Sequence, residues 1–126
     1  MKKITAILVV IILIGGCRKD SLPEPIPTKP LKDIDGNGYD TVKIANQFWM
    51  KQNLTTSHYR NGDPIPEVTS NAVWSSLTTG AWCWYKNDSA TYAATYGKLY
   101  NWFAVNDPRG LAPAGWHVAS EAEWTF

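Results

Sequence analysis

Residues 41–50 read TVKIANQFWM, and this stretch decides the kind of fold that the chain can form. Polar and apolar side chains alternate over residues 41–44, as they do in a strand with one buried face. Residues 47–50 form a second strand-like run, after Ala45 and Asn46, which have the length of a tight turn. Two such runs around two residues predict a β-hairpin, and therefore antiparallel pairing.

Both strand and helix patterns follow the hairpin. Residues 80–85 (GAWCWY) are an aromatic run typical of a strand, residues 70–77 (SNAVWSSL) predict a short helix, and residues 86–89 (KNDS) read as a turn. Apolar side chains then recur at helical spacing, which predicts the main helix over residues 96–104 with its aromatic stripe in the core. The stripe consists of Tyr96, Leu99, Tyr100, Phe103 and Ala104.

The last residues carry the start signal of another helix. Ser120 and Glu123 have the spacing of a capping box, in which each side chain bonds the backbone N–H of the other residue. The sequence ends at Phe126, one turn later, and so short a helix does not hold on its own. We therefore expect a natural domain that continues further, and a fold that is incomplete at its C-terminus.

The first sixteen residues have the pattern of an export signal. Two lysines precede an apolar run over residues 4–14, which is too short to cross a bilayer, since a spanning helix takes about 20 residues. Two glycines and Cys17 follow, and this arrangement resembles the bacterial lipobox. The resemblance implies cleavage after residue 16 and a lipid anchor on Cys17. Because Arg18 comes next, not aspartate, it also implies the outer membrane or cell surface; an ordinary signal peptide with an incidental cysteine is the alternative.

Residues 17–32 join the proposed anchor to the domain. Proline recurs there at nearly every second position and excludes both helix and central strand, because it fixes φ and lacks an N–H donor. The segment is expected to be an extended polyproline-II spacer that holds the domain away from the membrane. Its prolines are Pro23, Pro25, Pro27 and Pro30.

The charge of the chain argues against nucleic acid as a partner. Twelve Lys and Arg face eleven Asp and Glu, and removal of Lys2 and Lys3 with the signal leaves ten against eleven. A protein that binds nucleic acid needs a concentrated basic face. The sequence therefore predicts a near-neutral mature chain whose partners are the membrane, through its lipid, and a polysaccharide or an envelope protein.

No spacing of catalytic or metal-binding residues stands out. His58 and His117 are the only histidines and lie in different segments, so we predict no metal, no cofactor and no enzymatic activity. Cys83 stands between two tryptophans, where a buried, inert thiol is expected. Residues 33–39 (DIDGNGY) match the first positions of a calcium loop, but Ile44 occupies the place of the bidentate glutamate. A glycine-rich turn that enters a strand is the better interpretation.

Taken in order, five segments resemble the Fibrobacter succinogenes major paralogous domain, a family abundant in exported proteins of Bacteroidetes-type bacteria. The resemblance covers residues 33–126 as a partial domain. It implies an α+β fold, similar to C-type-lectin-like folds, with short antiparallel strands and one or two helices. The segments are DIDGNGYDTVKIANQFWMKQNL (33–54), HYRNGDPIP (58–66), GAWCWYKND (80–88), YGKLYNWFAV (96–105) and LAPAGWHVASEAEW (111–124).

Three positions depart from the family pattern. Ala45 replaces a usual glycine, so the backbone of the hairpin turn is expected to be more strained. Ala119 replaces a usual proline. Ala112 replaces a cysteine that the resemblance pairs with another near the family's C-terminus. The family has no settled activity, so the resemblance implies none for this chain.

Three classes of function remain. The first is a non-catalytic surface module that binds glycan or protein, with Trp82, Trp84 and Trp116 as candidate contacts, because sugar rings stack on exposed aromatic side chains. The second is a structural or assembly lipoprotein of the envelope, and a truncated paralogue without function stands beside it. The third is an enzyme, by similarity to formylglycine-generating enzymes, but Cys83 alone does not match that chemistry.

Overall fold

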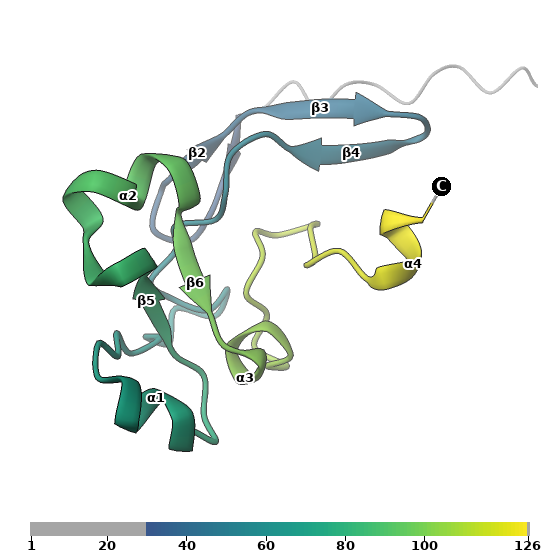
Figure 1. The fold of residues 1–126 in the computed structure, drawn as a ribbon. Helices are drawn as coiled ribbons and strands as arrows, with labels where there is room; N and C mark the ends of the chain where they lie inside the picture. Colours follow the sequence, from purple (N-terminus) through teal and green to yellow (C-terminus); the bar gives the residue numbers. More distant parts are fainter. Residues whose placement is uncertain (1–29, 126) are drawn as a thin grey trace, which may run out of the picture.

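The computed structural model describes residues 30–125. The predicted signal peptide, Cys17 and nearly all of the linker lie outside the described residues. Within residues 30–125, three two-stranded antiparallel sheets and four short α-helices make a small α+β fold (Figure 1), which confirms the fold class but with more helices than the one or two expected. No helix among these residues is long and apolar enough to span a membrane.

The hairpin predicted over residues 41–50 is confirmed. Strand β3 (Thr41–Ile44) pairs with β4 (Gln47–Met50), with Ile44 opposite Gln47 at the turn. Ala45 has a φ of 53°, a conformation that glycine adopts more easily than alanine. Helix α4 (Glu121–Trp124) lies beside this hairpin (Figure 1), and the rings of Trp49 and Trp124 are 4.7 Å apart.

A second hairpin precedes the first. Strand β1 (Leu31–Lys32) pairs with β2 (Gly38–Tyr39) around the turn at residues 33–37, so the turn entering a strand is confirmed. The carboxylate of Asp33 closes this turn, since it accepts hydrogen bonds from the Asn37 backbone N–H at 2.9 Å and from the Tyr39 hydroxyl at 2.6 Å. The Asp33 carboxylate, at the first position of a calcium loop, is therefore occupied by donors within this hairpin.

The main helix predicted over residues 96–104 is wrong. Helix α2 (Ser89–Tyr96) ends where that helix was expected to begin, and residues Lys98–Tyr100 form strand β6. The reason is Gly97, whose φ of 62° and ψ of −151° end the helix and turn the chain into a strand. Of the expected stripe, Tyr96 is the last residue of α2, Leu99 and Tyr100 lie in β6, and Phe103 and Ala104 lie in α3 (Trp102–Val105).

The other local predictions hold. Helix α1 (Asn71–Ser76) confirms the short helix predicted over residues 70–77. The Ser70 side chain caps its N-terminus. Strand β5 (Trp82–Trp84) lies in the aromatic run, and a 3-10 turn, η1 (Tyr85–Asn87), follows it. The capping box is present at α4, and hydrogen bonds from Ser120 and His117 lower the pKa of Glu123 to about 2.

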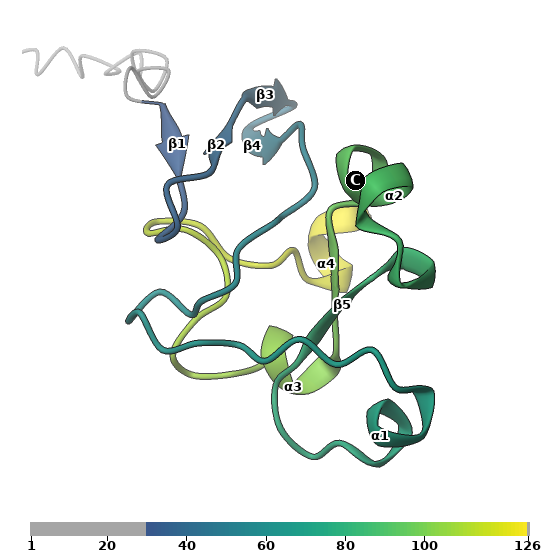
Figure 2. The same cartoon turned by 90° about the vertical axis from the view of Figure 1, so that its left-hand side faces the viewer.

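The core includes Trp82 of β5, the strand that pairs with β6 and that lies between α3 and α2 in Figure 2. The segment before α1 runs alongside β5. The backbone N–H of Val68 donates to the Trp82 carbonyl at 2.9 Å, and the backbone N–H of Trp82 donates to the Pro66 carbonyl at 3.0 Å. Aromatic and aliphatic side chains from four segments meet there. The buried cluster consists of Tyr59, Ile65, Trp82, Ala104 and Leu111.

Candidate functional site

The three tryptophans predicted as ligand contacts lie in different surroundings. Trp82 is only 7% exposed, and its indole N–H donates to the Ile65 carbonyl at 2.8 Å, so the ring belongs to the core. Trp84 is half-buried, with its ring centroid 5.4 Å from that of Trp82. Trp116 is half-buried in another segment, where its carbonyl accepts from Arg60. The structure thus brings the first two together and leaves little ring face of Trp82 for a ligand.

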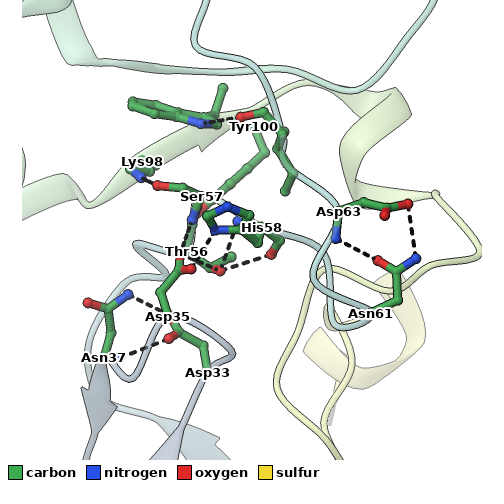
Figure 3. Close-up of polar contacts among 12 residues, drawn as sticks. Asp33, Asp35, Asn37, Thr56, Ser57, His58, Asn61, Asp63, Lys98 and Tyr100 are labelled. Atoms are coloured by element: carbon green, nitrogen blue, oxygen red, sulfur yellow. Dashed lines mark hydrogen bonds and ion pairs between the residues drawn. The ribbon is translucent and has the colours of Figure 1, made fainter.

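A polar cluster that the sequence did not suggest lies where the first turn meets residues 55–58 (Figure 3). Its centre is the carboxylate of Asp35, which accepts from the Ser57 backbone N–H at 2.5 Å and from the Thr56 hydroxyl at 3.1 Å. The other carboxylate oxygen lies 2.5 Å from His58 Nδ1. Burial raises the pKa of Asp35, but these hydrogen bonds outweigh it and hold the pKa below its ordinary value.

Lys98 joins this cluster to the aromatic strand. Its side chain comes from β6 and is buried, and its ammonium donates to the Ser57 hydroxyl. The ammonium also lies 3.8 Å from the ring centroid of Trp82 and 5.4 Å from that of Trp84. Burial lowers the pKa of Lys98, while the nearby carboxylates of Asp35, Glu67 and Asp33 act in the opposite direction.

A serine beside a lysine is a combination that can attack acyl groups when the amine is neutral. Here the Lys98 amine donates to Ser57 and faces the ring of Trp82, and both contacts favour its charged form. Together with the hydrogen bonds of Asp35, the contact between Lys98 and Ser57 joins the turn at residues 33–37 and strand β6 to residues 56–58.

We expect Asp35→Asn to lower the free energy of unfolding by about 1–3 kcal/mol at pH 7, since hydrogen bonds to a charged acceptor are lost. Because the folded pKa lies below the ordinary 3.8, the stabilisation is present above that value and is lost as the pH falls through the folded pKa. Urea unfolding at pH 7 and pH 3 measures this, with Glu121→Gln as control. An equal difference between Asp35→Asn and wild type at both pH values would contradict it.

A cluster of three tyrosines is the second feature that the sequence did not suggest. The ring of Tyr85 lies 5.0 Å from those of Tyr92 and Tyr96, which are 5.9 Å from each other. Tyr85 is 38% exposed and Tyr96 is 45% exposed. The spacing of Tyr92 and Tyr96 on α2 was the available signal, but Tyr96 had been assigned to the wrong helix.

The turn beside these tyrosines is built with backbone strain. Lys86 and Asn87 have φ values of 54° and 56°, which non-glycine residues adopt at an energetic cost. The Asn87 side chain donates to the Thr69 carbonyl at 2.9 Å and holds the turn in place. The Lys86 ammonium lies 5.6 Å from the ring centroids of both Tyr85 and Tyr92. Lys86 thus sets a positive charge beside a surface of aromatic rings.

Two further expectations from the sequence concern Cys83 and metal binding. Cys83 is a free, half-buried thiol in β5, and burial raises its pKa. Among residues 30–125, no group of three or more His, Cys, Asp or Glu side chains is arranged to hold a metal ion.

The short antiparallel strand pairs, the few short helices and the aromatic core define a small α+β domain of an aromatic-rich class. The family model of the Fibrobacter succinogenes major domain matches residues 42–126, and the chain belongs to this family. No curated protein and no solved structure matches the chain.

Proposed function

We propose that the chain is a lipid-anchored envelope protein whose domain is a non-catalytic module that binds glycan. The observation that supports the binding function is the tyrosine cluster of Tyr85, Tyr92 and Tyr96, in which Tyr85 and Tyr96 are exposed. Packed aromatic side chains lose little conformational entropy when a ligand covers them. Trp84, which is half-buried in the adjoining strand, remains a candidate contact.

Retention on immobilised polysaccharides tests the binding function. Replacing Tyr96 with alanine is expected to weaken retention about tenfold, which corresponds to the loss of one important aromatic contact. Tyr96→Phe keeps the ring and should retain most of the binding. Trp102→Ala removes a side chain that is 68% exposed and lies outside the tyrosine cluster, so it serves as the control. Equal weakening by Tyr96→Ala and Trp102→Ala would contradict the proposal.

The lipid anchor rests on the pattern of the N-terminus and has its own test. The intact protein extracted from the membrane fraction is expected to have the mass of a chain that begins at Cys17 and carries acyl chains. Two or three acyl chains hold a protein on a membrane stably, whereas one binds reversibly. Replacing Cys17 with serine should release the protein from the membrane fraction. A Cys17→Ser protein that stays anchored would exclude lipidation at this position.

A structural or assembly role in the envelope is the second candidate. Trp102 and Trp124 are 68% and 66% exposed, and tryptophan is enriched at protein–protein interfaces. Failure to bind any glycan, together with crosslinks from these two positions to one envelope protein, would favour this function over the first.

A further inference from the structure

A cavity of about 220 Å³ lies between β1 and the segment that follows α3. It shares no residue with the tyrosine cluster. Its walls are mostly aliphatic, but two cationic side chains and one carboxylate also line it. The lining residues are Lys32, Asp33, Ile34, Arg60, Leu111, Ala112, Pro113 and Ala114.

The guanidinium of Arg60 is held in place at this cavity. Arg60 Nε donates to the Ala112 carbonyl at 3.0 Å, and Nη2 donates to the Trp116 carbonyl at 2.9 Å. Gly110 makes room for the group, because a Cβ on Gly110 would lie 3.2 Å from Arg60 Cζ. The hydrogen bonds go to carbonyl groups, so they orient the guanidinium without neutralising it.

The charge of the lining is unbalanced. Among residues 30–125, no carboxylate forms an ion pair with Lys32 or Arg60. Asp33 also lines the cavity, but its oxygens already accept from the Asn37 backbone and side chain and from the Tyr39 hydroxyl. With two cationic side chains against one carboxylate, the lining of the cavity carries a net positive charge.

The size of the cavity limits what it can hold. A cavity of about 150 Å³ accepts one benzene ring, and pockets for drug-sized ligands begin at about 300 Å³. At about 220 Å³, this cavity suits one six-membered ring with a small substituent. A lining of two cationic and several aliphatic side chains matches a ring that carries both a carboxylate and C–H groups.

We propose that this cavity binds a single uronic-acid residue of an acidic polysaccharide, with its carboxylate between Lys32 and Arg60. That the ring is a sugar rests on the proposed glycan function, whereas the preference for a carboxylate rests on the cavity. The tyrosine cluster and this cavity would then be two separate contacts, only one of which selects charge.

Titration of the full chain in detergent with three small probes tests the proposal, with amide NMR shifts of Ala112 and Ala114 as the readout. Glucuronate is expected to bind at least about tenfold more tightly than glucose, which lacks the carboxylate, and than acetate, which lacks the ring. Lys32→Gln should weaken glucuronate binding about tenfold. Ala114→Leu, which fills the cavity without changing charge, should abolish it.

Lys51→Gln is the matched control, because it removes one charge from an exposed lysine outside the cavity. Arg60 is left intact, since its loss would also free the segment that it holds. Binding of acetate as tight as that of glucuronate, or equal weakening by Lys32→Gln and Lys51→Gln, would overturn the proposal. Retention on polysaccharide with unchanged affinity in Lys32→Gln and Ala114→Leu would overturn the cavity site and leave the glycan function intact. Absence of all saccharide binding in the wild type would overturn both.

Discussion

Replacing Trp82 with alanine is expected to lower the free energy of unfolding by about 3–5 kcal/mol, the range for removal of a large aromatic side chain from a core. The side chain is 7% exposed and packs in the cluster with Tyr59 and Ile65. Natural domains are stable by only about 5–15 kcal/mol. The variant is therefore expected to be largely unfolded at moderate urea concentrations at which the wild type is folded.

Two polar contacts of Trp82 add to this loss. Its indole N–H satisfies the Ile65 carbonyl at 2.8 Å, and its ring face lies 3.8 Å from the buried ammonium of Lys98. Removal of the ring takes away the aromatic face that stabilises the Lys98 ammonium, and an uncompensated buried charge is costly. The substitution should therefore also loosen the contact between Lys98 and Ser57.

Urea unfolding followed by circular dichroism measures the effect of Trp82→Ala. Trp102→Ala is the matched control, because it removes the same side chain where it is 68% exposed, and its effect should stay below about 1 kcal/mol. If the two variants proved equally stable, the core position of Trp82 would be refuted.

Gly97→Ala is expected to cost about 3 kcal/mol or more, for two reasons that act together. The φ of 62° with ψ of −151° is a conformation that only glycine adopts readily, and forcing another residue into it costs about 1–3 kcal/mol. A Cβ at this position would also lie 2.6 Å from the Leu54 carbonyl oxygen and 2.9 Å from Asn53 Cβ. Relief of this overlap requires the backbone to move, which adds a comparable cost.

The control for Gly97 is Gly38→Ala. Gly38 has no positive φ, and a Cβ there would meet no atom within 4 Å, so this substitution should change stability little. Thermal unfolding of both variants gives the comparison. A Gly97→Ala protein as stable as Gly38→Ala would mean that residue 97 lies within a helix, as the predicted helix over residues 96–104 requires.

The error over residues 96–104 has a clear physical origin. The side chains of Leu99 and Phe103 are partly exposed, at 40% and 41%, so the apolar spacing there does not mark one buried face. In β6, Lys98 is buried and Leu99 is exposed, which reverses what hydrophobicity alone predicts. The ring faces of Trp82 and Trp84 and the Ser57 hydroxyl accommodate that lysine, and all three come from other segments.

Local sequence patterns determined several of the secondary-structure elements of this protein. The hairpin of β3 and β4, the short helix α1, the capping box of α4 and the aromatic strand β5 were predictable from the sequence because each depends on residues a few positions apart. The resemblance drawn from five segments, and borne out by the family match, also came from sequence. The lipobox-like signal at Cys17 is of the same local kind and stays a prediction.

Only the tertiary structure decided the end of α2, the polar cluster around Asp35 and the cavity beside Arg60. The bonds of Asp35 with Ser57 and His58 join residues more than twenty positions apart, and those of Arg60 with Ala112 and Trp116 join residues more than fifty apart. No periodicity or spacing in the chain encodes such pairs. They arise because a buried or oriented polar group must find a partner in whatever segment the fold brings next to it.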